Sequence, residues 1–237
     1  PEEVEEERKR KLAIEDPCQL IGPRLQSQGR RIREHFPAAA RLMLVRGCLR
    51  TGLYQNEKYA TTYLDRVARV AQVDPDAEGG ARLTVEAARH VALQMTYQDT
   101  IHVALQKIRT QRLANIRKEA GAADDDLVDV HEYLHPEVEE LTDTMPAGVG
   151  RLLRKNKLFG AAVRGVGGKG IVVNTTSVPG FTTLSTLAKL RPMRPGTLRF
   201  KTVQKEVDAW LDQVVATARE DALLAQELVE AAGVVKG

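Results

Sequence analysis

Apolar residues recur at spacings of three and four along most of this 237-residue chain, a period that suits helices and not strands. The pattern is strongest over residues 37–72 and again over residues 81–117. Turn-forming pairs, Asp74-Pro75 and Gly79-Gly80, separate the two stretches. Aromatic residues make up only 4% of the chain, so the core must be built from aliphatic side chains. These features predict a mainly α fold, a multi-helix bundle with helical hairpins.

Strand-like sequence is confined to about Ala161–Asn174. Short apolar runs at 161–163 and 171–173 flank the glycine-rich run Gly165–Gly170, which predicts at most one small β-hairpin. The same glycine run could cradle a phosphate through its backbone N–H groups. A phosphate loop must open a helix, however, and here a β-branched stretch follows. We interpret the run as a hairpin tip, with the phosphate loop as the alternative.

Composition divides the chain into a lead-in and a body. Residues 1–36 are predicted to form a charged lead-in helix and linker, and residues 37–237 a helical domain. Within that domain we expect paired long helices over 37–120 and a basic C-terminal helical part over 121–237. Tyr54-Gln55-Asn56 and Tyr97-Gln98-Asp99 lie at similar places in the two long stretches, which favours a helical hairpin whether the similarity is a repeat or chance.

Charge is distributed very unevenly along the chain, although the net charge is only +3. Residues 147–205 contain twelve Lys and Arg and no Asp or Glu, whereas residues 119–143 contain ten acids and no Lys or Arg. Such segments predict complementary faces, either within one chain or between subunits, so a homo-oligomer is one expected arrangement.

The candidate site is a cluster of cations around two prolines, Arg191, Arg194, Arg199 and Lys201. Guanidinium groups suit carboxylates and phosphates. Three interpretations follow: pairing with the acidic segment Asp124–Asp143, binding of a partner subunit, or binding of an anion such as the phosphates of coenzyme A. Nucleic acid is not expected, because the basic region has almost no aromatic residues for stacking.

One stretch resembles a zinc motif. His131-Glu132-Tyr133-Leu134-His135 has the zincin spacing, which requires both histidines on one face of a helix. Pro136 directly follows the second histidine, and no third ligand is evident, so we expect a turn into the next helix and no metal. We also expect Asp124-Asp125-Asp126 to be a solvated acidic loop.

No catalytic residues are predicted, because no nucleophile and base occur in a recognisable arrangement. Cys18 and Cys48 match no metal or redox spacing, which indicates free thiols and a cytoplasmic protein. The chain has no run of about 18 apolar residues, so no membrane span is expected.

The block from Asn174 to Leu211 combines several helix signals. Thr175-Thr176-Ser177 leads to Pro179-Gly180 at a helix start, and Arg191–Gly196 breaks that helix before Thr197 caps a longer one. On the longer helix, Trp210 lies at helical spacing from Val203, Val207 and Val214, which predicts a largely buried indole.

This block carries a family resemblance. The patterns T-T-S-V-x-G-F and L-A-x-L-R-x-x-R-P-x-T-L-R-F, with Gln204 and Trp210-Leu211, resemble the C-terminal helical domain of the beta subunit of indolepyruvate ferredoxin oxidoreductases. The resemblance extends to His135-Pro136, Glu139-Glu140 and Met145-Pro146, and to the end of the chain at Val235-Lys236-Gly237. It covers most of the chain after about Leu42.

The resemblance implies a function for a larger assembly. Those enzymes oxidatively decarboxylate aryl 2-oxo acids to acyl-coenzyme A. Thiamine diphosphate and iron–sulfur clusters are then expected in a partner (alpha) subunit, with no cofactor bound by this chain except coenzyme A as a candidate ligand. The chain would serve assembly or cover the channel for substrate or coenzyme A. The alternative is a stand-alone helical adaptor that binds an acidic protein partner.

Overall fold

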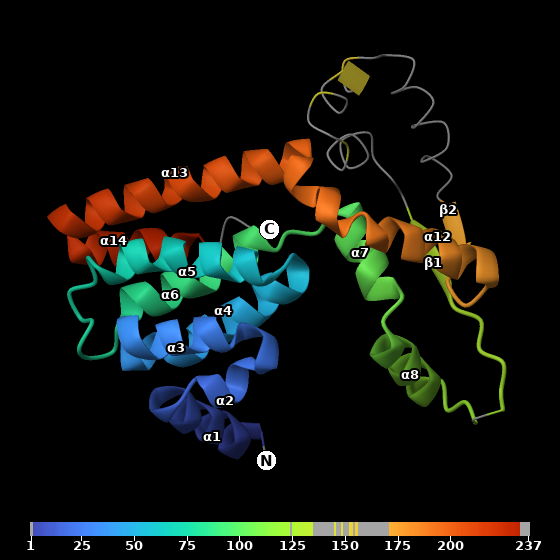
Figure 1. Ribbon diagram of the computed structural model, residues 1–237, viewed down its shortest axis with the longest axis horizontal. Helices are drawn as coiled ribbons and strands as arrows, with labels where there is room; N and C mark the ends of the chain where they lie inside the picture. Colours follow the sequence, from blue (N-terminus) through green and yellow to red (C-terminus); the bar gives the residue numbers. More distant parts are fainter. Residues whose placement is uncertain are drawn as a thin grey trace. The chain divides into compact units, whose positions relative to one another are not determined.

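The computed structural model describes residues 2–123, 125–134, 145, 148, 152–153, 155 and 171–232 (Figure 1). These residues are overwhelmingly helical, with one two-stranded antiparallel sheet, which confirms the mainly α prediction. The chain forms two compact units. The first unit comprises Pro1–Tyr97 and Val203–Gly237, and the second comprises Gln98–Thr202. The two long stretches predicted at 37–120 therefore contribute to both units.

The first unit contains the lead-in and the long helices. Its elements are α1 (Glu2–Glu15), α2 (Cys18–Ile21), η1 (Pro23–Leu25), α3 (Gln26–His35), η2 (Ala38–Ala40), α4 (Arg41–Tyr54), α5 (Glu57–Ala71), α6 (Arg82–Met95), most of α13 (Leu198–Glu220) and α14 (Ala222–Ala231). Residues of the lead-in are part of the core here, because Ile32 on α3 and the following Phe36 are buried.

An apolar core fills the centre of the first unit, where α4, α5 and α6 pack on one another (Figure 1). Helix α5 has the clearest apolar stripe, with Tyr63, Leu64, Val67 and Val70 all fully buried. A glycine allows α4 and α5 to approach closely, because a Cβ atom at Gly47 would lie 2.2 Å from the Tyr63 ring. The Tyr63 hydroxyl donates a hydrogen bond to the Ala88 carbonyl of α6, 3.1 Å away. One side chain thus contacts all three helices.

The two similar Tyr-Gln-Asx stretches have the same structural role. The Asn56 side chain caps α5 by accepting a hydrogen bond from the Tyr59 N–H at 2.9 Å. The Asp99 side chain caps α7 (Thr100–Lys107) in the same way, accepting from the His102 N–H at 2.6 Å. The tyrosines of the two stretches meet, since the Tyr54 and Tyr97 ring centroids lie 5.8 Å apart. Each stretch therefore ends one helix and starts the next.

The second unit contains α7, α8 (Thr110–Glu119), β1 (His131–Leu134), β2 (Ile171–Asn174), α12 (Val178–Lys189), η3 (Arg191–Gly196) and the first turn of α13. Helices α7 and α12 pack together and bury Ile101, Ala104, Leu184 and Ala188. The helical pattern over 81–117 is thus divided among α6, α7 and α8.

The sheet corrects one prediction. Strand β2 lies where a strand was expected, but it pairs antiparallel with β1, with His131 opposite Asn174 and Leu134 opposite Ile171. The zincin-like stretch therefore begins as a strand and not as a turn into a helix. The predicted partner strand at 161–163 and the glycine run at 165–170 lie outside the described residues.

Helix α13 corrects the prediction that the Trp210 indole is largely buried. Val207, Leu211 and Val214 are buried at spacings of four and three, whereas Trp210 is only half-buried. On a helix Trp210 lies to one side of the stripe that these three residues define, which leaves part of its indole in solvent. Among the described residues, no helix combines the length and the apolar character needed to cross a membrane.

Candidate functional site

Helix α12 leads into the predicted site, and its start is defined by local hydrogen bonds. The Ser177 side chain caps the helix by accepting a hydrogen bond from the Gly180 N–H at 3.2 Å. The Asn174 side chain accepts from the N–H groups of Thr176 and Ser177, each at 3.0 Å. A Cβ atom at Gly180 would lie 1.9 Å from the Asn174 carbonyl oxygen, so only glycine fits this turn. The Thr-Thr-Ser-Val-Pro-Gly sequence is therefore explained by local geometry.

The other end of α12 is also defined locally. Two prolines follow Lys189 within η3, and Thr197 then starts α13. The Thr197 hydroxyl accepts from the Phe200 N–H at 3.3 Å and donates to the Arg194 carbonyl at 2.8 Å. These bonds fix the backbone of the turn that carries the candidate cations.

Arg194 is fully buried and forms a two-pronged ion pair with Asp99. Its Nε lies 2.7 Å from Asp99 Oδ2, and its Nη2 lies 3.1 Å from Oδ1. Asp99 is itself buried and also caps α7, so one carboxylate joins the start of α7 to the turn after α12. A buried guanidinium needs such a partner because an unpaired charge is very costly to desolvate. The structure therefore places Arg194 as an internal brace of the second unit.

The remaining predicted cations lie at the surface around this brace. Arg191 and Arg199 are half-buried, and Lys201 is exposed. Lys189, at the end of α12, is exposed as well. We call Lys189, Arg191, Arg199 and Lys201 the basic turn. Two apolar side chains accompany it, since Leu190 and Met193 are 39% and 59% exposed. A surface of this kind suits an anion that also carries an apolar group.

The acidic segment was one predicted partner for these cations, but the described aspartates that precede β1 do not pair with them. Asp125, Asp126 and Asp129 are exposed, and none of the three forms an ion pair among the described residues. Asp126 accepts from the Ala123 N–H at 2.7 Å, and Asp129 from the Asn174 side chain at 3.2 Å. The carboxylate that Arg194 uses, Asp99, lies outside the segment predicted to pair with it.

Among the described acids of the segment, Glu132 is the one that pairs with cations. Its carboxylate, from β1, contacts Lys107 of α7 and Arg112 of α8, and its side chain is only 13% exposed. In a strand, successive side chains point to opposite faces, so Glu132 and His131 point away from each other. This arrangement differs from the helical geometry of a zincin site. His135 lies outside the described residues, and the described part of the chain contains no metal-binding group of three or more His, Cys, Asp or Glu.

The two cysteines lie in surroundings that disfavour the thiolate form. Both are free, and burial raises the pKa of the Cys48 thiol well above its ordinary value. Burial also raises the pKa of the Cys18 thiol, and the neighbouring Asp16 carboxylate raises it further. Neither thiol is activated as a nucleophile, because a nucleophilic cysteine needs a lowered pKa.

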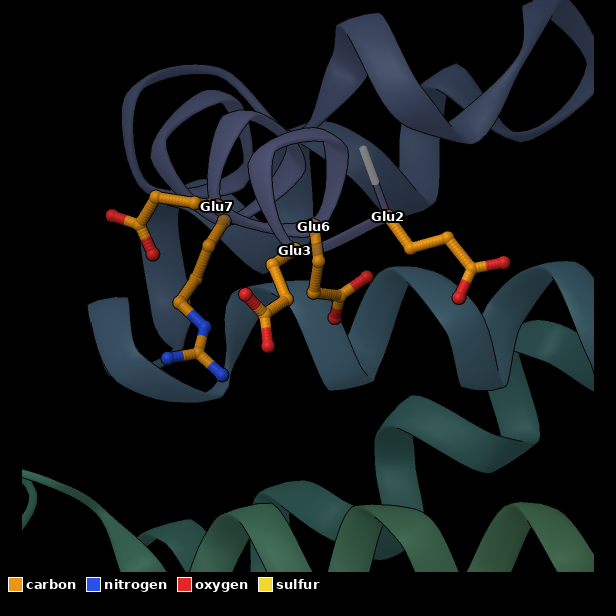
Figure 2. A pocket seen from close by; sticks show the side chains of 5 residues that line it. Glu2, Glu3, Glu6 and Glu7 are labelled. Carbon is orange, nitrogen blue, oxygen red and sulfur yellow. The ribbon is translucent and has the colours of Figure 1, made fainter.

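Among the described residues of the first unit, two surface depressions are of note. One, of about 440 Å³, lies on α1 and is lined by Glu2, Glu3, Glu6, Glu7 and Arg10 (Figure 2). Glu6 also bonds Arg46 of α4 at 2.6 Å, so this acidic face helps to hold α1 in place. The other depression, of about 370 Å³, lies between the end of α3 and the end of α5 and is lined by Arg31, His35, Phe36, Pro37, Ala68, Ala71, Gln72 and Ala77. Neither brings together a set of catalytic groups.

A polar network in the first unit involves residues that sequence reasoning did not connect. Arg66 of α5 is buried and forms an ion pair with Asp208 of α13, to which its Nε and Nη2 donate hydrogen bonds at 2.8 and 2.9 Å. It also donates to the Gln204 side chain at 2.5 Å, and that side chain donates to the Tyr59 hydroxyl at 2.8 Å. The Tyr59 hydroxyl in turn donates to the Met95 carbonyl at 2.9 Å. The helical phase of Arg66 on α5 was the only sequence signal that could have revealed this network.

One comparison with known proteins gives a match. The sequence model described as "Family of unknown function (DUF6537)" matches residues 40–237 of the chain. No curated protein and no solved structure matches the chain.

Proposed function

The chain belongs to the DUF6537 family of unknown function, and on the sequence resemblance described above we propose that it is a helical, non-catalytic domain of an indolepyruvate-type 2-oxo acid:ferredoxin oxidoreductase beta subunit. The whole assembly would oxidatively decarboxylate aryl 2-oxo acids to acyl-coenzyme A. This domain would serve assembly or cover the channel for substrate or coenzyme A. We propose a cytoplasmic location.

One observation carries the non-catalytic role. Three of the residues on which the family resemblance rests have architectural positions in this chain. Ser177 caps α12, Arg194 is buried against Asp99, and Gln204 links Tyr59 to Arg66. A resemblance carried by caps and buried pairs indicates a shared domain structure and not a shared set of reacting groups. This is the behaviour expected of a domain that supports chemistry located elsewhere.

The cofactors of such an assembly would be held by the partner alpha subunit. An iron–sulfur cluster is usually held by four cysteine thiolates, and this chain has two cysteines, one of them fully buried. Its residues therefore do not fit a cluster. We place thiamine diphosphate in the partner subunit for a related reason, since the sequence contains no recognisable thiamine motif.

The basic turn is the proposed contact surface of the domain. Its exposed lysines and half-buried arginines suit the carboxylates of a partner or the phosphates of coenzyme A, and Arg194 fixes the turn from inside. Guanidinium groups on a braced turn lose little conformational freedom when they bind, which favours such a contact.

The experiment is a binding measurement with the thiamine-enzyme subunit from the same source. The chain and the subunit are mixed, and the complex is measured by analytical ultracentrifugation with and without coenzyme A. We expect a stable complex, and oxidation of indolepyruvate by the subunit that increases when the chain is added.

A matched variant tests the contact surface. Lys189→Glu with Lys201→Glu should weaken the complex at least tenfold, whereas Glu2→Lys with Glu3→Lys on α1 should leave it unchanged. No complex with the thiamine-enzyme subunit would contradict the proposal. Binding of an unrelated acidic protein instead would favour the stand-alone adaptor.

A further inference from the structure

An exposed acidic strap precedes strand β1. We call residues Asp125–Val130 the acidic strap. Its carboxylates Asp125, Asp126 and Asp129 are exposed, and its Leu127 side chain is fully exposed at 101%. The strap thus combines a fully exposed leucine with charges that form no ion pair in the described residues. Such a combination suits an interface.

The backbone of the strap is held in place at both ends. The Thr175 N–H donates to the Val130 carbonyl at 2.8 Å, and the Val130 N–H donates to the Thr176 hydroxyl at 3.1 Å. Arg117 of α8 donates to the Asp126 carbonyl at 3.1 Å. The strap therefore presents its side chains from a fixed main chain, which lowers the entropy lost on binding.

The basic turn has the complementary character. Residues 171–205 contain no Asp or Glu, and Lys189 and Lys201 are exposed without an ion pair among the described residues. Met193 supplies an exposed apolar side chain beside them, as Leu127 does in the strap. The strap and the turn both belong to the second unit. Every copy of the chain thus displays both halves of one complementary pair.

We propose that the acidic strap of one copy binds the basic turn of a second copy, with Leu127 against the apolar side chains of the turn. Related by a twofold axis, two copies make this contact twice, which is the usual symmetry of a homodimer. The inference rests on the proposed role of the basic turn as a contact surface, and it assigns a second copy as the occupant of the turn when the thiamine-enzyme subunit is absent. A second copy is the occupant that the charges favour, because it neutralises both segments at once.

The test is a charge-reversal exchange followed by sedimentation velocity of the full chain alone. Asp125→Lys with Asp126→Lys makes the strap basic, and Lys189→Glu with Lys201→Glu makes the turn acidic. Each double variant should dimerise at least tenfold more weakly than the native chain. An equimolar mixture of the two variants should recover the dimer, because each reversed segment then meets its complement.

Two controls make the result specific. Glu2→Lys with Glu3→Lys on α1 changes charge by the same amount in the first unit and should leave the dimer intact. The native dimer should also weaken as salt rises from about 50 mM to 500 mM, because screening shortens the range of the attraction. Helix content from circular dichroism should be the same in all variants, since the changed side chains are exposed.

Failure of this inference can be told apart from failure of the proposed function. A native chain that stays monomeric, or a mixture of variants that does not recover the dimer, overturns the strap–turn contact whether or not the thiamine-enzyme subunit binds. A dimer that forms and exchanges as expected supports the contact, even if that subunit does not bind.

Discussion

The two units of this chain are stabilised in different ways. The first unit buries a large set of aliphatic and tyrosine side chains where α4, α5 and α6 meet. In the second unit, the described apolar core consists of Ile101, Ala104, Leu184 and Ala188. An equal number of polar side chains is buried with them, among them the Arg194–Asp99 pair.

The difference shows how each unit specifies its fold. Apolar packing is roughly proportional to the area removed from water and is not directional. A buried ion pair is directional and requires both partners, so removing one of them is severe. The first unit should therefore respond to changes in volume, and the second to changes in charge and hydrogen bonding.

The largest expected effect is on the second unit. Arg194→Met should lower its free energy of unfolding by about 3–5 kcal/mol, because the buried Asp99 carboxylate then loses the guanidinium that it pairs with. Hydrogen exchange should report the loss in α7 and α12 and leave α4, α5 and α6 protected. Lys201→Met, at an exposed position of the same region, should change stability by less than about 0.5 kcal/mol.

A double variant sharpens this result. Asp99→Asn keeps an acceptor for the α7 cap while removing the charge, so Arg194→Met with Asp99→Asn should be more stable than Arg194→Met alone. Equal stabilities would show that the charge of Asp99 does not cause the loss.

The next largest effect should come from a change of side-chain volume in the first unit. Gly47→Ala would bring a Cβ atom within 2.2 Å of the buried Tyr63 ring, and we expect a loss of about 1–3 kcal/mol on unfolding by urea. The matched control is on the same helix. A Cβ atom at Gly52 would meet the end of the Leu25 side chain at 3.3 Å and the Ala60 Cβ atom at 3.8 Å, so Gly52→Ala should be neutral or stabilising by up to about 1 kcal/mol. Equal losses at both sites would contradict the close α4–α5 contact.

Helix caps should give similar, smaller effects in both units. Asn56→Ala removes the cap of α5, and Ser177→Ala removes the cap of α12. Each should lower stability by about 1 kcal/mol, because one helix N–H loses its partner. Asn56→Asp and Ser177→Thr keep an acceptor and should restore most of the loss. A cap that is neutral in one unit only would show that this unit's helix is fixed by packing alone.

The smallest expected effect is a pH dependence of stability that arises in the first unit. Burial raises the pKa of the Cys48 thiol, so the folded chain keeps its proton while the unfolded chain loses it above the ordinary thiol pKa of about 8.5. The contribution of this proton to stability is complete below that pH and decreases as the pH rises. At pH 9 the loss should be about 0.8 kcal/mol. The free energy of unfolding, measured by denaturation at pH 7 and at pH 9, should differ less between the two pH values in Cys48→Ala than in the native chain. The same difference in both proteins would contradict a raised pKa at Cys48.

Much of the local structure could be predicted from the sequence. The start of α12 at Ser177 and its end before the two prolines both follow from residues within a few positions of the backbone groups they satisfy. The roles of Asn56 and Asp99 as caps are local in the same sense. Helix period and capping are determined by neighbours along the chain, so the sequence is sufficient to find them.

The sequence did not show which of the four predicted cations would be buried. Arg194 is an internal brace, whereas Arg191 and Arg199 are half-buried and Lys201 is exposed. Burial could not be read from the pattern, because arginine is rarely buried unless it is paired. The chain offers 32 acidic residues as partners, and nothing local distinguishes Asp99 among them.

By itself, then, the sequence determined the helical class, the positions of the main turns and the uneven charge. The tertiary structure decided which distant groups meet: Arg194 with Asp99, Gln204 with Tyr59, and β1 with β2. It also decided that Trp210 lies beside the buried stripe of α13 and not on it. Local hydrogen bonds depend on a few neighbouring residues, whereas long-range pairs depend on how helices pack after the intervening chain has been closed into a loop.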